Sequence, residues 1–376
     1  MEAKLRSELQ SSLAPAVRMA GKFTAIWQSQ PNSADWTGSA GLVVWLTELF
    51  GPYVSEIIYD GKHEVVKDNV ILFDAWVYAH DPSYYAKFHG KNAFLVHPFD
   101  EYLELGIDRY VHFRGVFRMI WSSVFNPQRV MVFPLGSYID EPPATVTPAS
   151  QRCYAWSFIG DAAKVSRPDM IHAMSSIEPH ICFSDTPVRG ITFADPNRRG
   201  GKRFTKDEFY QIMGQSVFAP APQGNATLES CRPYDGLEVG CIPIIERRMT
   251  LDYYRQLLGD HPLPTISSWS HAPELVRTLL KDPARLDDLQ QTCVGWWKNY
   301  KKTLIERIGN FLDERSGTQD ELVPLCSRLP NLPLWQYAEL LRHHDLRGFN
   351  RRVVRQINRL FTEKKWRAAI TKIGDV

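Results

Sequence analysis

The sequence lacks the long apolar runs and paired cysteines that define several protein classes. Its 376 residues contain no run of eighteen apolar residues, so no membrane-spanning helix is predicted. Residues 1–20 lack the continuous apolar core of a signal peptide. The six cysteines form no C-x-x-C pair, which argues against a zinc site and a disulfide framework. Reduced, buried thiols are the simpler expectation, and they indicate a cytoplasmic protein.

An excess of charge of one sign is also nearly absent. The formal net charge is +2, which gives no indication of a nucleic-acid partner. With 44% hydrophobic and 23% charged residues, the composition is that of an ordinary folded protein. The chain is too long for one core of usual size, so we expect two domains. Whether the natural chain is longer and carries an N-terminal anchor is left open.

Two cofactor motifs are missing as well. No predicted strand is followed by G-x-G-x-x-G, which argues against a dinucleotide-dependent oxidoreductase. The sequence contains no Asp-x-Asp pair. We therefore expect neither a cofactor nor a metal ion.

The first part of the chain alternates short apolar segments with helical stretches. We predict strands at residues 23–27, 55–59, 70–76, 94–97, 111–113 and 130–133, and a helix at 35–50 that ends at Gly51-Pro52. This alternation is typical of a parallel sheet covered on both faces, so the fold class is α/β and the domain Rossmann-like. The proline-rich residues 141–148 predict a linker, which gives an N-terminal domain at 1–145 and a second domain at 146–333.

The second part repeats the pattern. We predict strands at residues 154–159, 180–183, 217–219, 242–245 and 265–269, a helix at 167–177, and a long helix from 283 to about 313 whose Trp296 and Trp297 pack in the core. Residues 334–376 are expected to be helices that pack back across both domains. They hold ten Lys or Arg against four Asp or Glu, so peripheral contact with an anionic membrane is the alternative interpretation.

The most informative stretch is residues 216–246. Pro233 and Gly240 suit the first turn and the C-terminal end of a helix of about seven residues. Its amino end would carry unpaired N–H groups near Ser230 and Arg232, which are the groups that bind a diphosphate. Asp235 would lie one turn further, near a ribose diol. The alternative is an ordinary strand-helix-strand unit in which glycine and proline only mark the turns.

These residues resemble the donor-binding signature of exostosin-like glycosyltransferases of family 47. The matching positions are Gly224, Ser230, Arg232, Asp235 and the Gly-Cys-Ile-Pro run at 240–243, although the family often has Glu where Asp235 stands. Gly160, Ser166 and Arg167 resemble the family's second donor segment, which makes Arg167 the second expected phosphate ligand. The resemblance implies a GT-B fold, in which two Rossmann-like domains face each other across a cleft.

A second match lies in the first part. His97, Asp100 and Glu101 form a His-x-x-Asp-Glu turn after a predicted strand. An aromatic-arginine segment with Arg114 and Arg118 follows, and then Pro134-Leu-Gly, in an order similar to the acceptor side of the same family. Asp100 or Glu101 could take the proton of an acceptor hydroxyl, with His97 as neighbour or substitute base. The alternatives are that Asp100 caps a helix and that His97 is bonded in the core. Asp74, at a strand end, is a further candidate.

Together these patterns predict an inverting glycosyltransferase that moves a sugar from a nucleotide-sugar, by resemblance a UDP-sugar, to a hydroxyl of a saccharide or polysaccharide. Two alternatives stay open at this point. One is a nucleotide-sugar epimerase of GT-B fold, and the other is a non-catalytic carbohydrate-binding protein.

Overall fold

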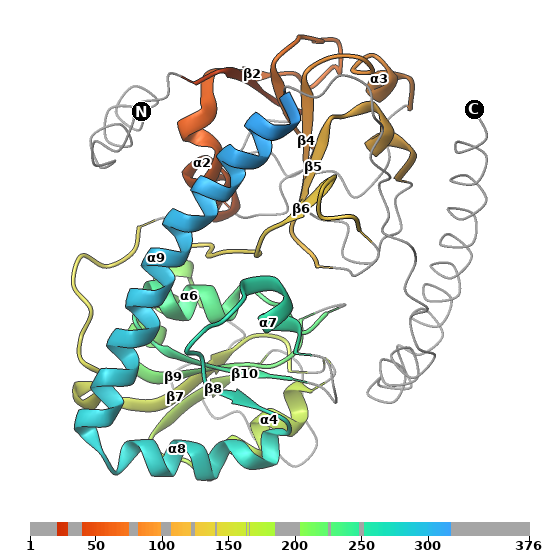
Figure 1. Cartoon of the computed structure of the whole chain (residues 1–376). Coiled ribbons are helices and arrows are strands. Elements are labelled where there is room, and N and C mark those ends of the chain that lie inside the picture. Colours follow the sequence, from red (N-terminus) through yellow and green to blue (C-terminus); the bar gives the residue numbers. More distant parts are fainter. Residues whose placement is uncertain are drawn as a thin grey trace, which may run out of the picture.

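The computed structural model describes residues 21–28, 40–74, 82–98, 107–121, 125–139, 141–162, 164, 166–184, 204–224, 227–247 and 252–316. These residues form two parallel sheets, one in each half of the chain, joined along one side by a long helix (Figure 1). The predicted α/β class with two Rossmann-like sheets is confirmed. None of the helices in these residues is both long and apolar enough to cross a membrane.

The first sheet has six parallel strands in the order β2-β1-β3-β4-β5-β6. The strands are β1 Phe23–Trp27, β2 Val54–Tyr59, β3 Val70–Phe73, β4 Ala93–His97, β5 Gly115–Arg118 and β6 Val130–Val132. Both faces of this sheet are covered, because Ile71 and Phe73 of β3 enter one apolar cluster while Val70 and Leu72 enter another. This explains the unbroken apolar runs of the central strands. The helical elements here are α2 Ala40–Phe50, η2 Gly51–Tyr53, α3 Pro82–Ala86 and η3 Ile107–His112.

The second sheet has five parallel strands in the order β11-β10-β9-β7-β8. The strands are β7 Tyr154–Ile159, β8 His180–Phe183, β9 Ser216–Ala221, β10 Ile242–Glu246 and β11 Thr265–Ile266. The helical elements are η4 Ala149–Gln151, α4 Arg167–Met174, α5 Lys206–Gly214, α6 Arg232–Glu238, α7 Tyr253–Leu258, η5 Trp269–His271 and α8 Ala272–Leu280. The predicted seven-residue helix is confirmed as α6, which is followed by Gly240 at φ +77°.

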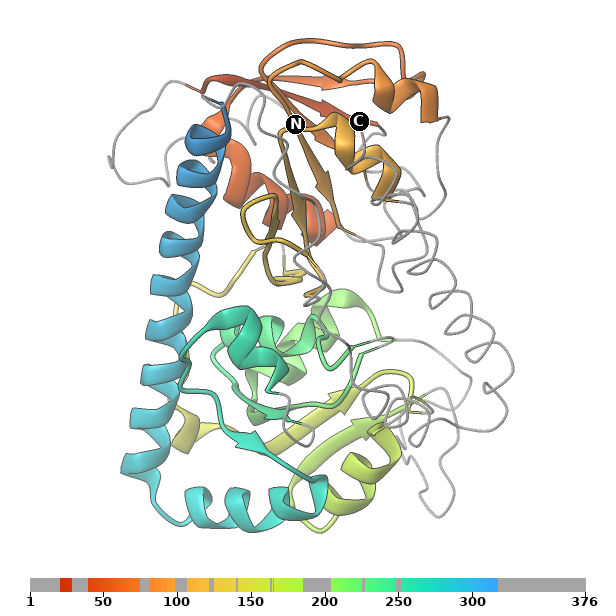
Figure 2. The same cartoon turned by 45° about the vertical axis from the view of Figure 1, so that its right-hand side comes forward.

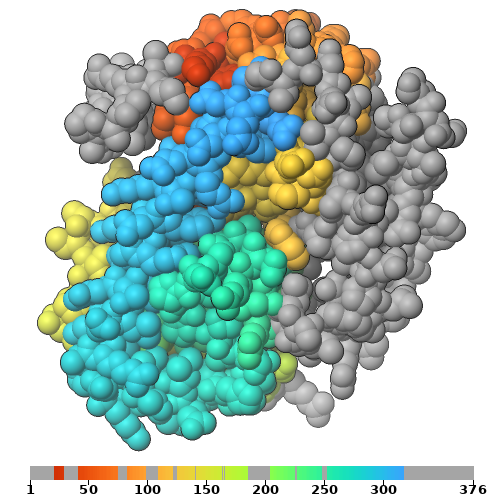
Figure 3. Space-filling view, in the orientation of Figure 1, coloured from red at the N-terminus to blue at the C-terminus, as the bar shows by residue number. Residues whose placement is uncertain are grey.

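Helix α9, Pro283–Ser316, connects the two halves. Its 34 residues correspond to roughly 50 Å of helix, and it packs on α2 and β5 of the first half and on α6 and β10 of the second. Figures 2 and 3 show it running along the side of both halves. Trp297 is buried between Trp45 and Tyr234, with ring centroids at 5.7 and 5.2 Å. Its predicted place in the core is confirmed.

One predicted strand is wrong, and the strand predicted at 265–269 is too long, because β11 ends at Ile266 and Trp269 begins η5. Residues 111–113 belong to η3 and the turn after it, and the strand begins at Gly115. Packing determines where this strand lies. Val116 and Phe117 are fully buried, and Gly115 lies against the Phe311 ring of α9, where a Cβ would come within 2.5 Å of the ring. As a result Arg118, but not Arg114, lies at the carboxyl end of the strand.

The domain limits stay a prediction. The expected boundary at 145–146 falls between β6 and β7, where η4 is the one regular element among the described residues. Residues 334–376, which were expected to pack across both domains, lie outside the described residues. In the described part, α9 is the helix that packs on both halves.

Candidate active site

The strand order of the second sheet reverses between β7 and β9, although all its strands are parallel. From β7 the chain moves to β8 on one side and then returns to β9 on the other. Ligands of open parallel sheets bind at the carboxyl ends of the strands on either side of such a switch point. Here those ends are Ile159 of β7 and Ala221 of β9, and both predicted phosphate-binding arginines lie beside them.

Arg167 begins α4 and reaches across the switch point. Its Nη1 donates to the carbonyl of Asp161 at 2.8 Å, and its Nε donates to the carbonyl of Gln223 at 3.2 Å. These two bonds connect the loops that follow β7 and β9. Burial lowers the pKa of Arg167 from its usual range, which means that the guanidinium lies where its charge is poorly solvated.

Arg232 begins α6 and lies on the other side of the same point. Its Nη2 donates to the carbonyl of Ile159 at 2.8 Å, and its guanidinium stacks 4.3 Å from the centroid of the Phe158 ring. Part of the side chain is exposed, but Nη1 is buried and has no hydrogen-bond partner. Burial, reinforced by the nearby charge of Arg167, lowers the pKa of Arg232 to about 10.

The two guanidiniums are therefore neighbours of like charge. Neither makes an ion pair with an acidic side chain among the described residues. Ordinarily a poorly solvated charge in a protein is paired. This arrangement creates a site of positive potential, and a bound anion would neutralise part of its charge.

A chain of hydrogen bonds supports the Arg167 side of the site. Ser166 Oγ accepts from the backbone N–H of Gln223 at 3.1 Å and donates to Glu246 Oε1 at 2.8 Å. Glu246 ends β10 and also accepts from Trp269 Nε1 at 2.6 Å. Sequence reasoning missed Glu246, although its position directly after the apolar run of β10 was a readable signal.

The remaining predicted donor residues have different surroundings. A Cβ on Gly224 would lie 2.0 Å from the carbonyl oxygen of Glu229, so this position needs glycine for the loop to close. Its N–H donates to the carbonyl of Thr227 at 3.0 Å. The Ser230 side chain is partly exposed and makes no hydrogen bond to the described residues. Ser230 therefore keeps a hydroxyl available to a ligand, whereas Gly224 shapes the loop.

Asp235 lies one turn into α6 and is 3% exposed. Its Oδ1 accepts from Ser137 Oγ at 2.9 Å and from the backbone N–H of Tyr138 at 2.8 Å, both in the first half. Burial raises the pKa of this carboxyl to about 6. The predicted contact with a ribose diol stays a prediction, and Oδ1 already has other partners.

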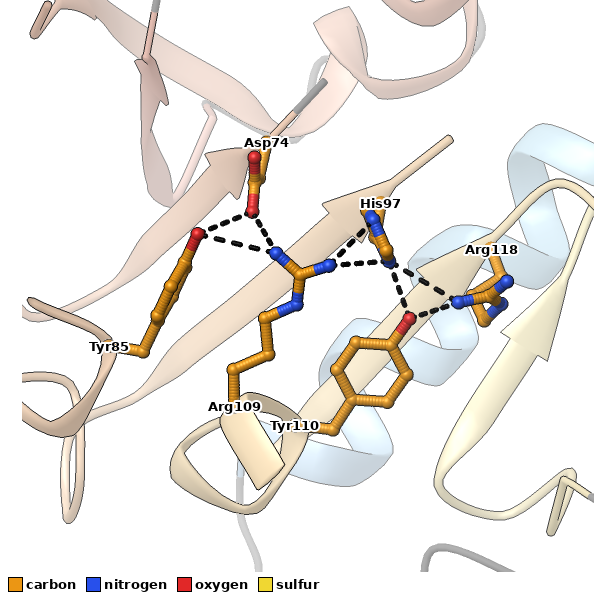
Figure 4. Close-up of polar contacts among 6 residues, drawn as sticks. All are labelled: Asp74, Tyr85, His97, Arg109, Tyr110 and Arg118. Carbon is orange, nitrogen blue, oxygen red and sulfur yellow. Dashed lines mark hydrogen bonds and ion pairs between the residues drawn. The ribbon is translucent and has the colours of Figure 1, made fainter. Parts of the chain in front are cut away.

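Polar side chains also gather at the carboxyl edge of the first sheet (Figure 4). Asp74 at the end of β3 is fully buried, accepts from Tyr85 Oη at 2.8 Å, and forms an ion pair of 2.8 Å with Arg109 Nη1. Arg109 Nη2 lies 2.8 Å from Nε2 of His97. Asp74, the candidate at a strand end, is thus already paired with Arg109 in the interior. Sequence reasoning missed Arg109.

His97 ends β4 and is 1% exposed. A guanidinium can only donate, so Nε2 accepts from Arg109. Nδ1 lies 2.6 Å from Tyr110 Oη and 3.3 Å from Arg118 Nη1, and Tyr110 Oη accepts from Arg118 (Figure 4). With both nitrogens engaged and two guanidiniums at the ring, His97 is unsuited to take up a proton, and its alternative as a bonded core residue fits better.

Asp100 and Glu101 lie outside the described residues. In the described part of the chain, no group of three or more His, Cys, Asp or Glu side chains is placed to hold a metal ion. The base and the expected metal independence both stay predictions.

No protein-family model matches the chain, and no curated protein matches it. Among solved structures it is similar to an α1,3-fucosyltransferase, at 12% identity over 78% of this chain and 93% of that one, with a TM-score of 0.45. It is also similar to a glycosyltransferase from Rickettsia africae ESF-5, at 11% identity over 79% and 100%, TM-score 0.45. A third is the DNA-modifying enzyme β-glucosyltransferase, at 10% identity over 77% and 99%, TM-score 0.47. Because these TM-scores are below 0.5, we base the functional proposal on this chain's own side chains.

Proposed function

We propose that this chain is a glycosyltransferase that moves a sugar from a nucleoside-diphosphate sugar to a hydroxyl of a saccharide acceptor. The donor would bind at the carboxyl edge of the second sheet and the acceptor at the edge of the first. The runner-up functions are a nucleotide-sugar epimerase and a non-catalytic carbohydrate-binding protein, and no contact in the described residues favours either.

The observation that carries the proposal is the pair of guanidiniums at the β7/β9 switch point. Arg167 and Arg232 both have a lowered pKa, no carboxylate partner among the described residues, and, in Arg232, a buried Nη1 without an acceptor. A buried N–H left without an acceptor costs about 1–3 kcal/mol. Phosphate oxygens would supply the missing acceptors, and they bind arginine better than any neutral ligand.

The same pair gives a reason for catalysis. When the bond from the sugar to the diphosphate breaks, negative charge develops on the leaving oxygens. Guanidiniums already held in place by the Ile159 and Asp161 carbonyls would stabilise that charge without having to reorganise. In this role Arg167 and Arg232 do what a metal ion does in other transferases, so we expect transfer without added metal.

Attack by the acceptor hydroxyl needs a base, and we propose Asp100 or Glu101 for this step. A single displacement of this kind inverts the anomeric centre. The resemblance to exostosin-like enzymes supports both inversion and a UDP donor. Asp100→Asn and Glu101→Gln should remove transfer but keep UDP binding, which calorimetry can measure.

The proposal is tested by binding of diphosphates and nucleotides. Wild-type protein should show a raised melting temperature with UDP- or another nucleoside-diphosphate sugar, because a ligand that binds only the folded chain stabilises it. Arg232→Met and Arg167→Met should lose this shift. The matched control is Arg285→Met, which removes an exposed arginine on α9.

Transfer is then measured with the donor that binds. Incubating the protein with this donor but without any acceptor distinguishes a transferase from an epimerase, because an isomerised sugar would indicate an epimerase. If no donor from a panel of UDP-, GDP-, ADP- and CMP-sugars shifts the melting temperature, the glycosyltransferase proposal is wrong.

A further inference from the structure

Two buried carboxylates of the second half hold the backbone of the first half. Glu229 Oε1 accepts from the N–H of Leu135 at 2.8 Å. Asp235 Oδ1 accepts from the N–H of Tyr138 at 2.8 Å and from Ser137 Oγ at 2.9 Å. We call Glu229 and Asp235 the carboxylate clamp.

The clamp is built from buried groups on both sides. Glu229 is 2% exposed and accepts two further bonds, from Tyr234 Oη at 2.7 Å and from Tyr253 Oη at 3.0 Å. Tyr253 Oη in turn accepts from the N–H of Trp121, which follows β5 of the first half, at 3.1 Å. Hydrogen bonds to charged groups in a dry interface are stronger than neutral ones, so these contacts define how the halves meet.

Helix α6 carries both the clamp and the donor arginine. Arg232 is its first residue and Asp235 lies one turn later, on a helix of only seven residues. Any shift of α6 relative to residues 135–138 would therefore move Arg232 by a similar amount. The distance between the arginine and the edge of the first sheet is thereby fixed through a single short helix.

We propose that Asp235, with Glu229, is a positioning residue that orients the first half relative to Arg232, and that it is not a ligand of the nucleotide. This inference rests on the proposed glycosyltransferase function. It replaces the ribose contact expected from the sequence with a contact inside the protein. Misplacement of reacting groups by about 1 Å is enough to slow a bimolecular reaction about 100-fold.

The first test compares UDP with inorganic pyrophosphate, which has no ribose. In Asp235→Ala the dissociation constants of both should change by less than about threefold, while kcat for transfer falls about 10- to 100-fold, as expected for loss of bonds to a charged group. Asp235→Asn keeps an oxygen where Oδ1 accepts both bonds, so it should recover most of kcat. A loss of UDP affinity with unchanged pyrophosphate affinity would assign Asp235 to the ribose and overturn the proposal.

The second test approaches the clamp from the other half. Ser137→Ala removes one bond to Asp235 without touching α6. We expect a smaller fall in kcat, and we expect the double variant with Asp235→Ala to be no slower than Asp235→Ala alone, because the two residues act through one contact. Fully multiplicative effects would overturn the proposal.

The third test needs no substrate. Hydrogen exchange at the amide of Tyr138 should be faster in Asp235→Ala, and exchange at the amide of Leu135 faster in Glu229→Ala, than in wild type. Asp260→Asn, which changes an exposed carboxylate paired with Arg255, is the control and should leave those amides unchanged. If wild type binds neither pyrophosphate nor any nucleotide-sugar of the panel, the glycosyltransferase proposal falls, and unchanged exchange at both amides overturns the clamp independently.

Discussion

Arg232 is expected to lower the free energy of unfolding of the protein, so replacing it should raise that free energy. In Arg232→Met an unbranched apolar side chain of similar length takes its place over Phe158. The charge, the bond to the Ile159 carbonyl and the repulsion from Arg167 are lost together. We expect the variant to be more stable than wild type and unable to bind a diphosphate.

The magnitude follows from the pKa. Burial lowers the pKa of Arg232 well below its ordinary value, to about 10. At about 1.4 kcal/mol per pKa unit, the charged form is disfavoured by about 3 kcal/mol at every pH below 10, where both the folded and the unfolded chain are protonated. Loss of the bond to Ile159 and of the stacking on Phe158 offsets about 1–2 kcal/mol of this. The net gain of about 1–2 kcal/mol would raise the melting temperature of a chain this long by about 1–3 °C.

The assay is thermal unfolding at neutral pH, with and without pyrophosphate. Arg285→Met is the matched control, because it removes an exposed arginine, and its melting temperature should stay close to that of wild type. Pyrophosphate should stabilise the control and wild type but not Arg232→Met. If Arg232→Met melts below the control, the guanidinium makes a net contribution to stability where it lies. The reasoning that treats it as a destabilising group kept for anion binding is then refuted.

Three further outcomes can be measured. Because burial raises the pKa of Asp235 to about 6 from 3.8, the folded chain holds this proton more tightly than the unfolded chain, and stability from this group falls as pH rises through that window. The melting temperature of Asp235→Asn minus that of wild type should thus be more positive at about pH 7.5 than at about pH 4.5. Denaturant unfolding should show that Gly136→Ala loses more stability than Gly259→Ala, since both have positive φ but a Cβ at 136 would lie 2.2 Å from the Trp45 ring while 259 is open. Ser166→Ala, which removes the acceptor of the Gln223 N–H and a donor to a buried carboxylate, should weaken pyrophosphate binding about tenfold in calorimetry without changing the far-UV circular dichroism.

Much of the fold could be predicted because its signals are local. Short apolar runs identified strands such as β1, β4 and β8, and Pro233 with Gly240 identified α6. Helix α5 had an equally local signal that was not used, a capping box between Thr205 and Glu208. The position of β5 could not be found in this way, because it depends on Phe311 of α9, almost two hundred residues further along the chain.

The candidate site was predicted in part for the same reason. Arg167 and Arg232 follow strand ends, and parallel strands bring such positions to one edge. The partners of Asp235 and His97 could not be predicted, because Ser137, Tyr138 and Arg109 come from distant segments whose contacts exist only after folding. A polar residue at a strand or helix end shows that a bond will form there, but its sequence neighbours do not determine the partner.

The route of α9 has a consequence for how the chain reaches its final state. Phe311 and Ile308 complete the core of the first half against Phe117 and its neighbours, and Tyr53 Oη donates to the carbonyl of Ile305 at 2.6 Å. During synthesis the first sheet emerges early, yet the helix that seals it is made after the whole second sheet. The amino-terminal half must therefore wait on the ribosome with an unfinished apolar face, so chaperone contact and aggregation risk should be greatest before residue 312 emerges.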